Sequence, residues 1–192
     1  MSPWLDSEQA GVATDLWRLL DARRGERGED GIQAISDAIA TAPSFGALDL
    51  QTATVTLMSA VQDALASGQC RDRRVLHRRW IVGLILGLER RAYDLEEGAY
   101  IIAYNILCIA VERGMILAVV ARSLAWSFGN AQRRLGWQED RKGRLQAALA
   151  RGLADAEVHL EGEVEQHVSR WMRENLVRGW RAGEFWGRLT PR

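Results

Sequence analysis

The chain has 192 residues, 47% of them hydrophobic, which suits the core of one ordinary domain. Its 25 Lys and Arg residues balance 25 Asp and Glu residues, so the formal net charge is zero. Nucleic-acid-binding proteins usually carry a basic surplus, and the balance therefore argues against that class. Two cysteines, Cys70 and Cys108, do not imply a disulfide framework and favour a reducing compartment.

The spacing of apolar residues is helical nearly throughout, with only three prolines and no alternation typical of strands. A first helix is predicted over Ser7–Arg23. The charged, glycine-rich stretch Arg23–Gly31 follows, and we expect it to be a mobile linker. This division predicts an N-terminal helix and linker over 1–31 and a helical domain over 32–192.

Three further helices are predicted over Ile32–Ala42, from Asp49 to Ser67 and from Asp72 to Arg91. Asp49 is expected to be the N-cap of the second of these. Asp94 is followed three residues later by Glu97, a spacing that resembles a capping box for a helix ending at Gly114.

That helix and the next, Met115–Leu135, carry apolar residues around most of their circumference. Helices of this kind are normally buried. We therefore predict an all-α, single-domain helical bundle in which an apolar central hairpin is wrapped by amphipathic helices. Glu112, Arg113 and Gly114 interrupt the longest apolar stretch, so no transmembrane anchor is expected.

The last part of the chain is predicted to form a long amphipathic helix over Glu139–Val168. Two short helices should follow, Ser169–Val177 and Trp180–Arg188. The start of the chain lacks a signal-peptide pattern, and we expect a cytoplasmic protein that could associate peripherally with a membrane.

No motif in the sequence predicts catalysis or a cofactor, and we expect a protein that is not an enzyme. His159, Glu163 and His167 are spaced by four residues, which puts them on one helical face and makes them a weak metal-site candidate. A solvated acidic face is the simpler interpretation, because further glutamates surround them. Cys108 lies in an apolar helix and is predicted to be a core residue.

Two other clusters have a functional and a structural interpretation. Asp94, Glu96 and Glu97 could be paired carboxylates, although helix capping explains them more simply. The basic run Arg71–Arg79, followed by Trp80, could contact phosphates, and it could equally be a polar helix face. With the neutral overall charge, we expect no nucleic-acid partner.

Three of the eight tryptophans, Trp171, Trp180 and Trp186, lie in the last 22 residues. Large aromatic side chains at such positions either cap the core or anchor a binding partner. The sequence favours the first interpretation and leaves the second open.

The segment from Trp171 through Glu174 and Asn175 to Gly179 and Trp180, followed by Phe185, resembles the second homology motif of the Bcl family of apoptosis regulators. One extra residue precedes the glycine. Upstream, the stretch 121–129 resembles the first homology motif of that family, although Val-Val-Ala replaces the usual Asn-Trp-Gly before the arginine.

The resemblance, which is closest to degenerate viral members, implies an inhibitor that captures an amphipathic death-promoting helix in a surface groove. Arg122 would pair with an aspartate of the bound helix, and Trp126 would help to form the groove. Trp171 and Trp180 would brace its end, and the resemblance also places Gly179 and Phe185 among the partner-binding residues. The alternative is an unrelated all-helical antagonist of bacterial or phage origin that binds one partner protein and could be a homodimer.

Overall fold

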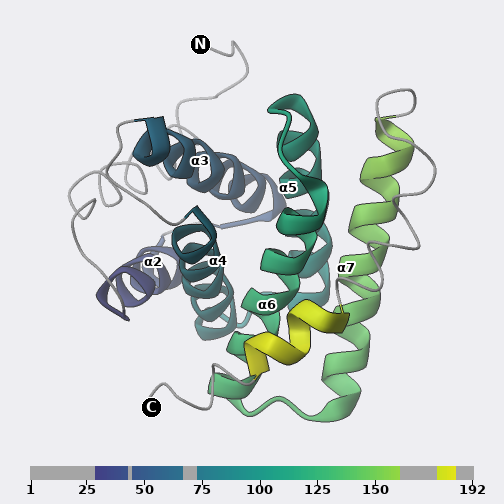
Figure 1. Ribbon diagram of the computed structural model, residues 1–192. Coiled ribbons are helices and arrows are strands. Elements are labelled where there is room, and N and C mark those ends of the chain that lie inside the picture. Colours follow the sequence, from purple (N-terminus) through teal and green to yellow (C-terminus); the bar gives the residue numbers. More distant parts are fainter. Residues whose placement is uncertain (1–28, 43–44, 67–72, 161–176, 185–192) are drawn as a thin grey trace. The chain divides into compact units, whose positions relative to one another are not determined.

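The computed structural model describes residues 29–42, 45–66, 73–160 and 177–184. All regular structure within these residues is helical, which confirms the predicted all-α class. The labelled helices are α2 (Glu29–Thr41), α3 (Ala47–Ala66), α4 (Arg73–Arg90), α5 (Leu95–Glu112), α6 (Leu117–Leu135) and α7 (Glu139–His159) (Figure 1). A short helix over 177–184, here named the C-terminal helix, follows α7.

The chain divides into two compact units, Met1–Ala92 and Tyr93–Arg192. The predicted helix over Ser7–Arg23 lies outside the described residues. The boundary predicted between residues 31 and 32 falls inside α2, which begins at Glu29. The end of the predicted linker is thus the first helical turn, where Asp30 is favourably placed near the positive end of the helix dipole.

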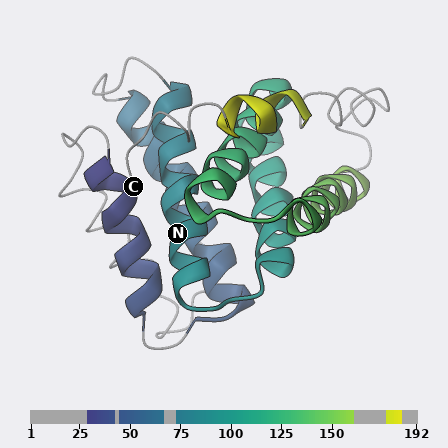
Figure 2. The same cartoon turned by 90° about the horizontal axis from the view of Figure 1, so that it is seen from below.

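The first unit is built around the contact of α2 with α4, which lie side by side in both views (Figures 1 and 2). Two glycines of α4, one helical turn apart, allow this close approach. A Cβ atom at Gly83 would lie 2.7 Å from the carbonyl oxygen of Ile32, and one at Gly87 would lie 2.6 Å from the Cβ atom of Ile39. At these two positions α4 therefore contributes only its backbone to the contact with α2.

Two arginines at the end of α4 complete the contact. Nη1 of Arg91 donates hydrogen bonds to the carbonyl oxygens of Ile39 and Ala42, at 3.0 and 2.8 Å. These are carbonyls at the C-terminus of α2, which have no partner within the helix. Arg90 forms an ion pair with Asp37 of α2. The end of α2 is thus capped by α4.

The start of α3 differs from the prediction. The helix begins at Ala47, two residues before Asp49, so Asp49 lies in its first turn and is not the N-cap. Its Oδ2 atom accepts a hydrogen bond from the backbone N–H of Gly46 at 2.7 Å. The carboxylate still accepts a hydrogen bond from a backbone N–H group that has no partner within the helix, but it does so from the first helical turn.

Ala92, which follows α4, has a φ of 54° and is the one non-glycine residue with positive φ in the described part of the chain. The left-handed conformation costs an L-residue roughly 1–2 kcal/mol, which glycine avoids. Glycine also has more conformational freedom in the unfolded chain, and this offsets part of the gain from the substitution. We expect Ala92→Gly to raise the free energy of unfolding by about 0.5 kcal/mol. Urea unfolding followed by circular dichroism measures the change.

Gly114 is the matched control for this change. Its φ is 60° and no atom lies within 4 Å of its Cβ position. Gly114→Ala should therefore lower stability by about 1 kcal/mol through backbone strain alone. Equal effects of the two substitutions would contradict the assignment of strain to Ala92.

The second unit begins at the predicted cap of α5. Oδ1 of Asp94 accepts hydrogen bonds from the backbone N–H groups of Glu96 and Glu97, at 2.9 and 3.3 Å. The capping interpretation of this cluster is confirmed. The helix ends where Gly114 turns the chain and the N–H of Met115 donates to the carbonyl of Ala110 at 2.8 Å, a Schellman motif.

Helix α5 contacts both α6 and α7, and its larger contact is with α7. A Cβ atom at Gly152 of α7 would lie 3.0 Å from the Cβ atom of Ala103. The sequence predicted α5 and α6 as the central pair, whereas the larger contact of α5 is with α7, where Gly152 leaves room for the backbone of Tyr100. No helix in the described part of the chain is both long and apolar enough to cross a membrane.

Candidate protein-binding site

The C-terminal helix packs directly on the backbone of α6, which it crosses in both views (Figures 1 and 2). A Cβ atom at Gly179 would lie 2.5 Å from the carbonyl oxygen of Arg122. One at Gly183 would lie 2.8 Å from the carbonyl carbon of Trp126. On the α6 side, Gly129 leaves room in the same way, because a Cβ atom there would lie 3.0 Å from the carbonyl carbon of Trp180. Glycines of both helices therefore allow the two backbones to touch where they cross.

This contact overturns the predicted break between Val177 and Trp180. The described helix runs from 177 to 184 without interruption, and Gly179 lies inside it. A glycine within a helix usually weakens it by about 1 kcal/mol. Here the loss is offset because the missing side chain allows α6 to approach.

Trp180 is 1% exposed and lies between the C-terminal helix and α6. Its ring stacks on that of Phe128, with the centroids 6.1 Å apart. Its Nε1–H donates a hydrogen bond of 2.5 Å to Oε1 of Gln132, which is itself buried. Trp180 is therefore a core side chain of this unit, and its indole N–H is satisfied inside the protein.

An exposed stripe of α6 lies beside this contact, because the backbones of Arg122 and Trp126 lie against Gly179 and Gly183. Val119, Arg122 and Trp126 are spaced by three and four residues, which places them on one helical stripe. Val119 is 36% exposed, Arg122 is exposed and Trp126 is half-buried. Ile116, at the N-cap of α6, is 71% exposed. Val177, the first residue of the C-terminal helix, is 47% exposed.

An ion-pair network holds the C-terminal helix from its other side. Nζ of Lys142 on α7 lies 3.0 Å from a carboxylate oxygen of Glu184 and 3.3 Å from one of Glu139. Partial burial alone would lower the pKa of Lys142, but the bonds to Glu184 and Glu139 outweigh it and raise the pKa. Lys142 therefore stays charged and links α7 to the C-terminal helix.

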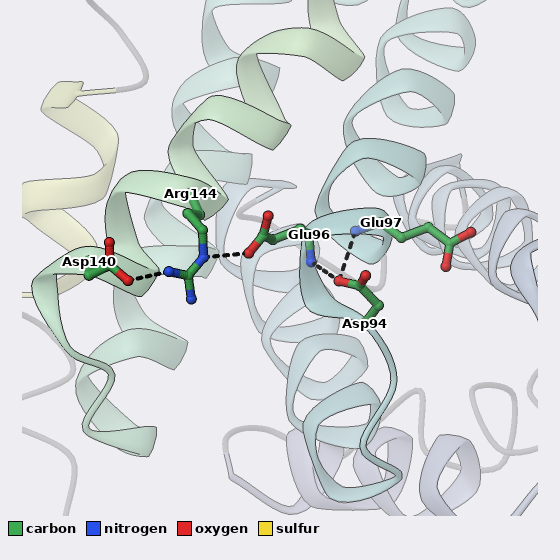
Figure 3. A network of polar contacts seen from close by, with 5 residues as sticks. All are labelled: Asp94, Glu96, Glu97, Asp140 and Arg144. Carbon is green, nitrogen blue, oxygen red and sulfur yellow. Dashed lines mark hydrogen bonds and ion pairs between the residues drawn. The ribbon is translucent and has the colours of Figure 1, made fainter.

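A second network joins the starts of α5 and α7 (Figure 3). Nε of Arg144 on α7 donates a hydrogen bond of 2.6 Å to Glu96 of α5, and its Nη1 pairs with Asp140. The bond to Glu96, followed by the charge of Asp140, raises the pKa of Arg144 further. Asp94 caps α5 in the same view. The carboxylates of Asp94, Glu96 and Asp140 therefore all form contacts that stabilise the helices.

The structure describes part of the two segments that carry the family resemblance. Of the resemblance residues, Arg122, Trp126, Gly179 and Trp180 come together at the contact of α6 with the C-terminal helix, whereas Trp171 and Phe185 lie outside the described residues.

The metal-site candidate is only partly described. His159 is exposed at the end of α7, with its ring 6.0 Å from that of Tyr104. Glu163 and His167 lie outside the described residues. No group of three His, Cys, Asp or Glu side chains suited to a metal ion is found among the residues that the structure places.

Cys108 is half-buried and not fully in the core as predicted. Burial, followed by the charge of Glu112, raises the pKa of its thiol. A raised thiol pKa disfavours the thiolate, which is the nucleophilic form. The position therefore suits a structural cysteine.

Three residues that build the site were not predicted: Gly183, Gln132 and Lys142. Gly179 and Gly183 are four residues apart, a spacing that would have signalled close helix packing. Lys142 is also the only lysine in a chain with 24 arginines. No sequence pattern pointed to Gln132, because its role depends on where Trp180 lies.

Comparisons with protein-family models, with curated proteins and with solved structures gave no match.

Proposed function

We propose that this chain is a non-catalytic protein that binds an amphipathic helix of a partner protein on the face formed by α6 and the C-terminal helix. One observation carries the proposal. The two segments that resemble the Bcl homology motifs, about 50 residues apart in sequence, are in direct backbone contact. Arg122 remains exposed on the same stripe as Val119 and Trp126.

The chemistry of that stripe suits such a ligand. A helix recognised on a surface presents its apolar face to apolar side chains and uses a few polar contacts to set its register. Val119, Ile116 and Val177 supply exposed apolar surface, and Arg122 supplies a cation beside it. An aspartate of the ligand would pair with that guanidinium through charge-assisted hydrogen bonds. The resemblance makes regulation of apoptosis the proposed context.

Arg122→Ala tests the role of this side chain. We expect the affinity for a death-promoting amphipathic helix to fall by roughly 1.5–3 kcal/mol, the range for a hydrogen bond to a charged group. Because Arg122 is exposed, the unfolding transition should stay within about 0.5 kcal/mol of wild type. Fluorescence polarisation with labelled peptides, beside urea unfolding, measures both quantities.

The control is Arg151→Ala, which removes an exposed arginine from α7. It should leave the affinity unchanged. Changing the aspartate of the peptide to alanine should weaken wild-type binding but have little further effect on the Arg122→Ala variant. Full affinity of that variant would remove Arg122 from the proposed role.

The alternative proposal is an unrelated helical antagonist, for which a homodimer through the exposed apolar residues is one arrangement. Light scattering distinguishes the two. A dimer that persists when Ile116 is replaced by serine and a lack of binding to any death-promoting helix would favour the alternative.

A further inference from the structure

Charge is unevenly distributed along the chain, although its formal sum is zero. Helix α6 contains three arginines and no acidic residue. The C-terminal helix adds Arg178 and Arg181, and its one acidic residue, Glu184, is paired with Lys142. The two helices that form the proposed binding face therefore carry five arginines and no uncompensated carboxylate of their own.

Three of these arginines, Arg122, Arg178 and Arg181, are exposed on the two helices that also expose aliphatic side chains. On the C-terminal helix, Gly179, Trp180 and Gly183 are buried, whereas Val177, Arg178 and Arg181 are exposed. On α6, Arg122 lies on the exposed stripe with Val119. The face therefore combines exposed aliphatic side chains with arginines from both helices.

From this charge distribution we infer that the partner helix is acidic, with carboxylates flanking its apolar stripe in addition to the one that would pair with Arg122. The inference rests on the proposed function. A basic apolar face disfavours a basic ligand by repulsion and favours an acidic one, and electrostatic complementarity mainly sets specificity and association rate. Arg178 and Arg181 are thus specificity-determining residues for the ligand.

The test compares two synthetic helical peptides with the same leucine stripe and one aspartate. In one peptide the flanking positions are glutamine, and in the other they are glutamate. We expect the glutamate peptide to bind the full chain about three- to tenfold more tightly at low salt, the effect of two or three exposed ion pairs. The difference should disappear at high salt, because screening weakens such pairs.

The matched variants are Arg178→Gln with Arg181→Gln, and Arg151→Gln as the control. The double substitution should lower the affinity for the glutamate peptide to that for the glutamine peptide, so that the preference disappears. The control should retain the preference. Circular dichroism verifies that the variants are folded.

Each other result has a separate meaning. Equal binding of both peptides by the wild-type chain would overturn the inference and leave the proposed function standing. Binding of neither peptide would overturn the proposed function and the inference with it. Arginine-dependent binding to phosphatidylserine vesicles without a preference for the glutamate peptide would also overturn the inference, because the charge would then serve a membrane surface.

Discussion

Gly183→Ala is expected to lower the free energy of unfolding by about 3 kcal/mol, at the upper end of the range for overpacking. The added Cβ would lie well inside 3.0 Å of the Trp126 carbonyl and 2.9 Å from the backbone nitrogen of Asn130. Helix backbone cannot give way as a flexible side chain can. The C-terminal helix would therefore have to move off α6 as a whole.

That movement would disturb Trp180. Its ring would separate from Phe128, and its N–H would leave Gln132, whose Oε1 is then left buried without this donor. An unsatisfied buried group adds about 1–3 kcal/mol to the destabilisation unless water enters. Urea unfolding with tryptophan fluorescence measures stability, and hydrogen exchange of the peptide containing residues 177–184 measures release of the helix.

Gly143→Ala is the matched control in the same unit. Gly143 lies in α7 with no atom within 4 Å of its Cβ position. Alanine there should raise stability by up to about 1 kcal/mol, because it is the better helix former. If the two substitutions shifted stability in the same direction, the close contact of the C-terminal helix with α6 would be refuted.

Gly87→Ala is expected to destabilise the first unit by about 1–3 kcal/mol, even though alanine favours the helix. Its Cβ would lie 2.6 Å from the Cβ of Ile39, 2.9 Å from the Cγ2 atom of the same residue and 2.9 Å from the carbonyl oxygen of Ser36. Ile39 is only 1% exposed, and its Cβ cannot be moved by a change of rotamer. To relieve the clash, helix α2 would have to move away from α4.

Loss of this contact would also separate Arg91 from the carbonyls that it caps at the end of α2. We therefore expect faster hydrogen exchange in α2 as well as a lower urea midpoint. Gly31→Ala in α2 is the control, because no atom lies within 4 Å of its Cβ position. It should stabilise the unit, and an equally destabilised Gly31→Ala variant would mean that glycine flexibility, not close packing, explains the effect.

The sequence predicts the local structure correctly where that structure depends on contacts between neighbouring residues. The Asp94 cap and the stop at Gly114 both involve contacts within five residues. The errors lie at other boundaries. Asp49, predicted as the N-cap, lies three residues after the actual N-cap, Gly46. The predicted break between Val177 and Trp180 is absent, because a glycine that ends a helix and a glycine that admits a neighbouring helix have the same identity.

The candidate site divides in the same way. The sequence predicted that Arg122 and Trp126 share a helix, and that Gly179 and Trp180 belong to a second helical segment. It favoured a core-capping role for Trp180 over an anchoring role without deciding between them. Only its burial against Phe128 and its bond to Gln132 make it a core residue, and neither contact is local in the sequence.

The sequence by itself determined the helical class, because apolar spacing and the scarcity of proline act within single turns. Only the tertiary structure decided which helices touch. At Gly87, Gly152 and Gly183 the missing side chain allows another helix to approach closely. The glycine itself does not specify which helix that will be. That choice depends on the packing of residues 48 or more positions apart, which no local pattern records.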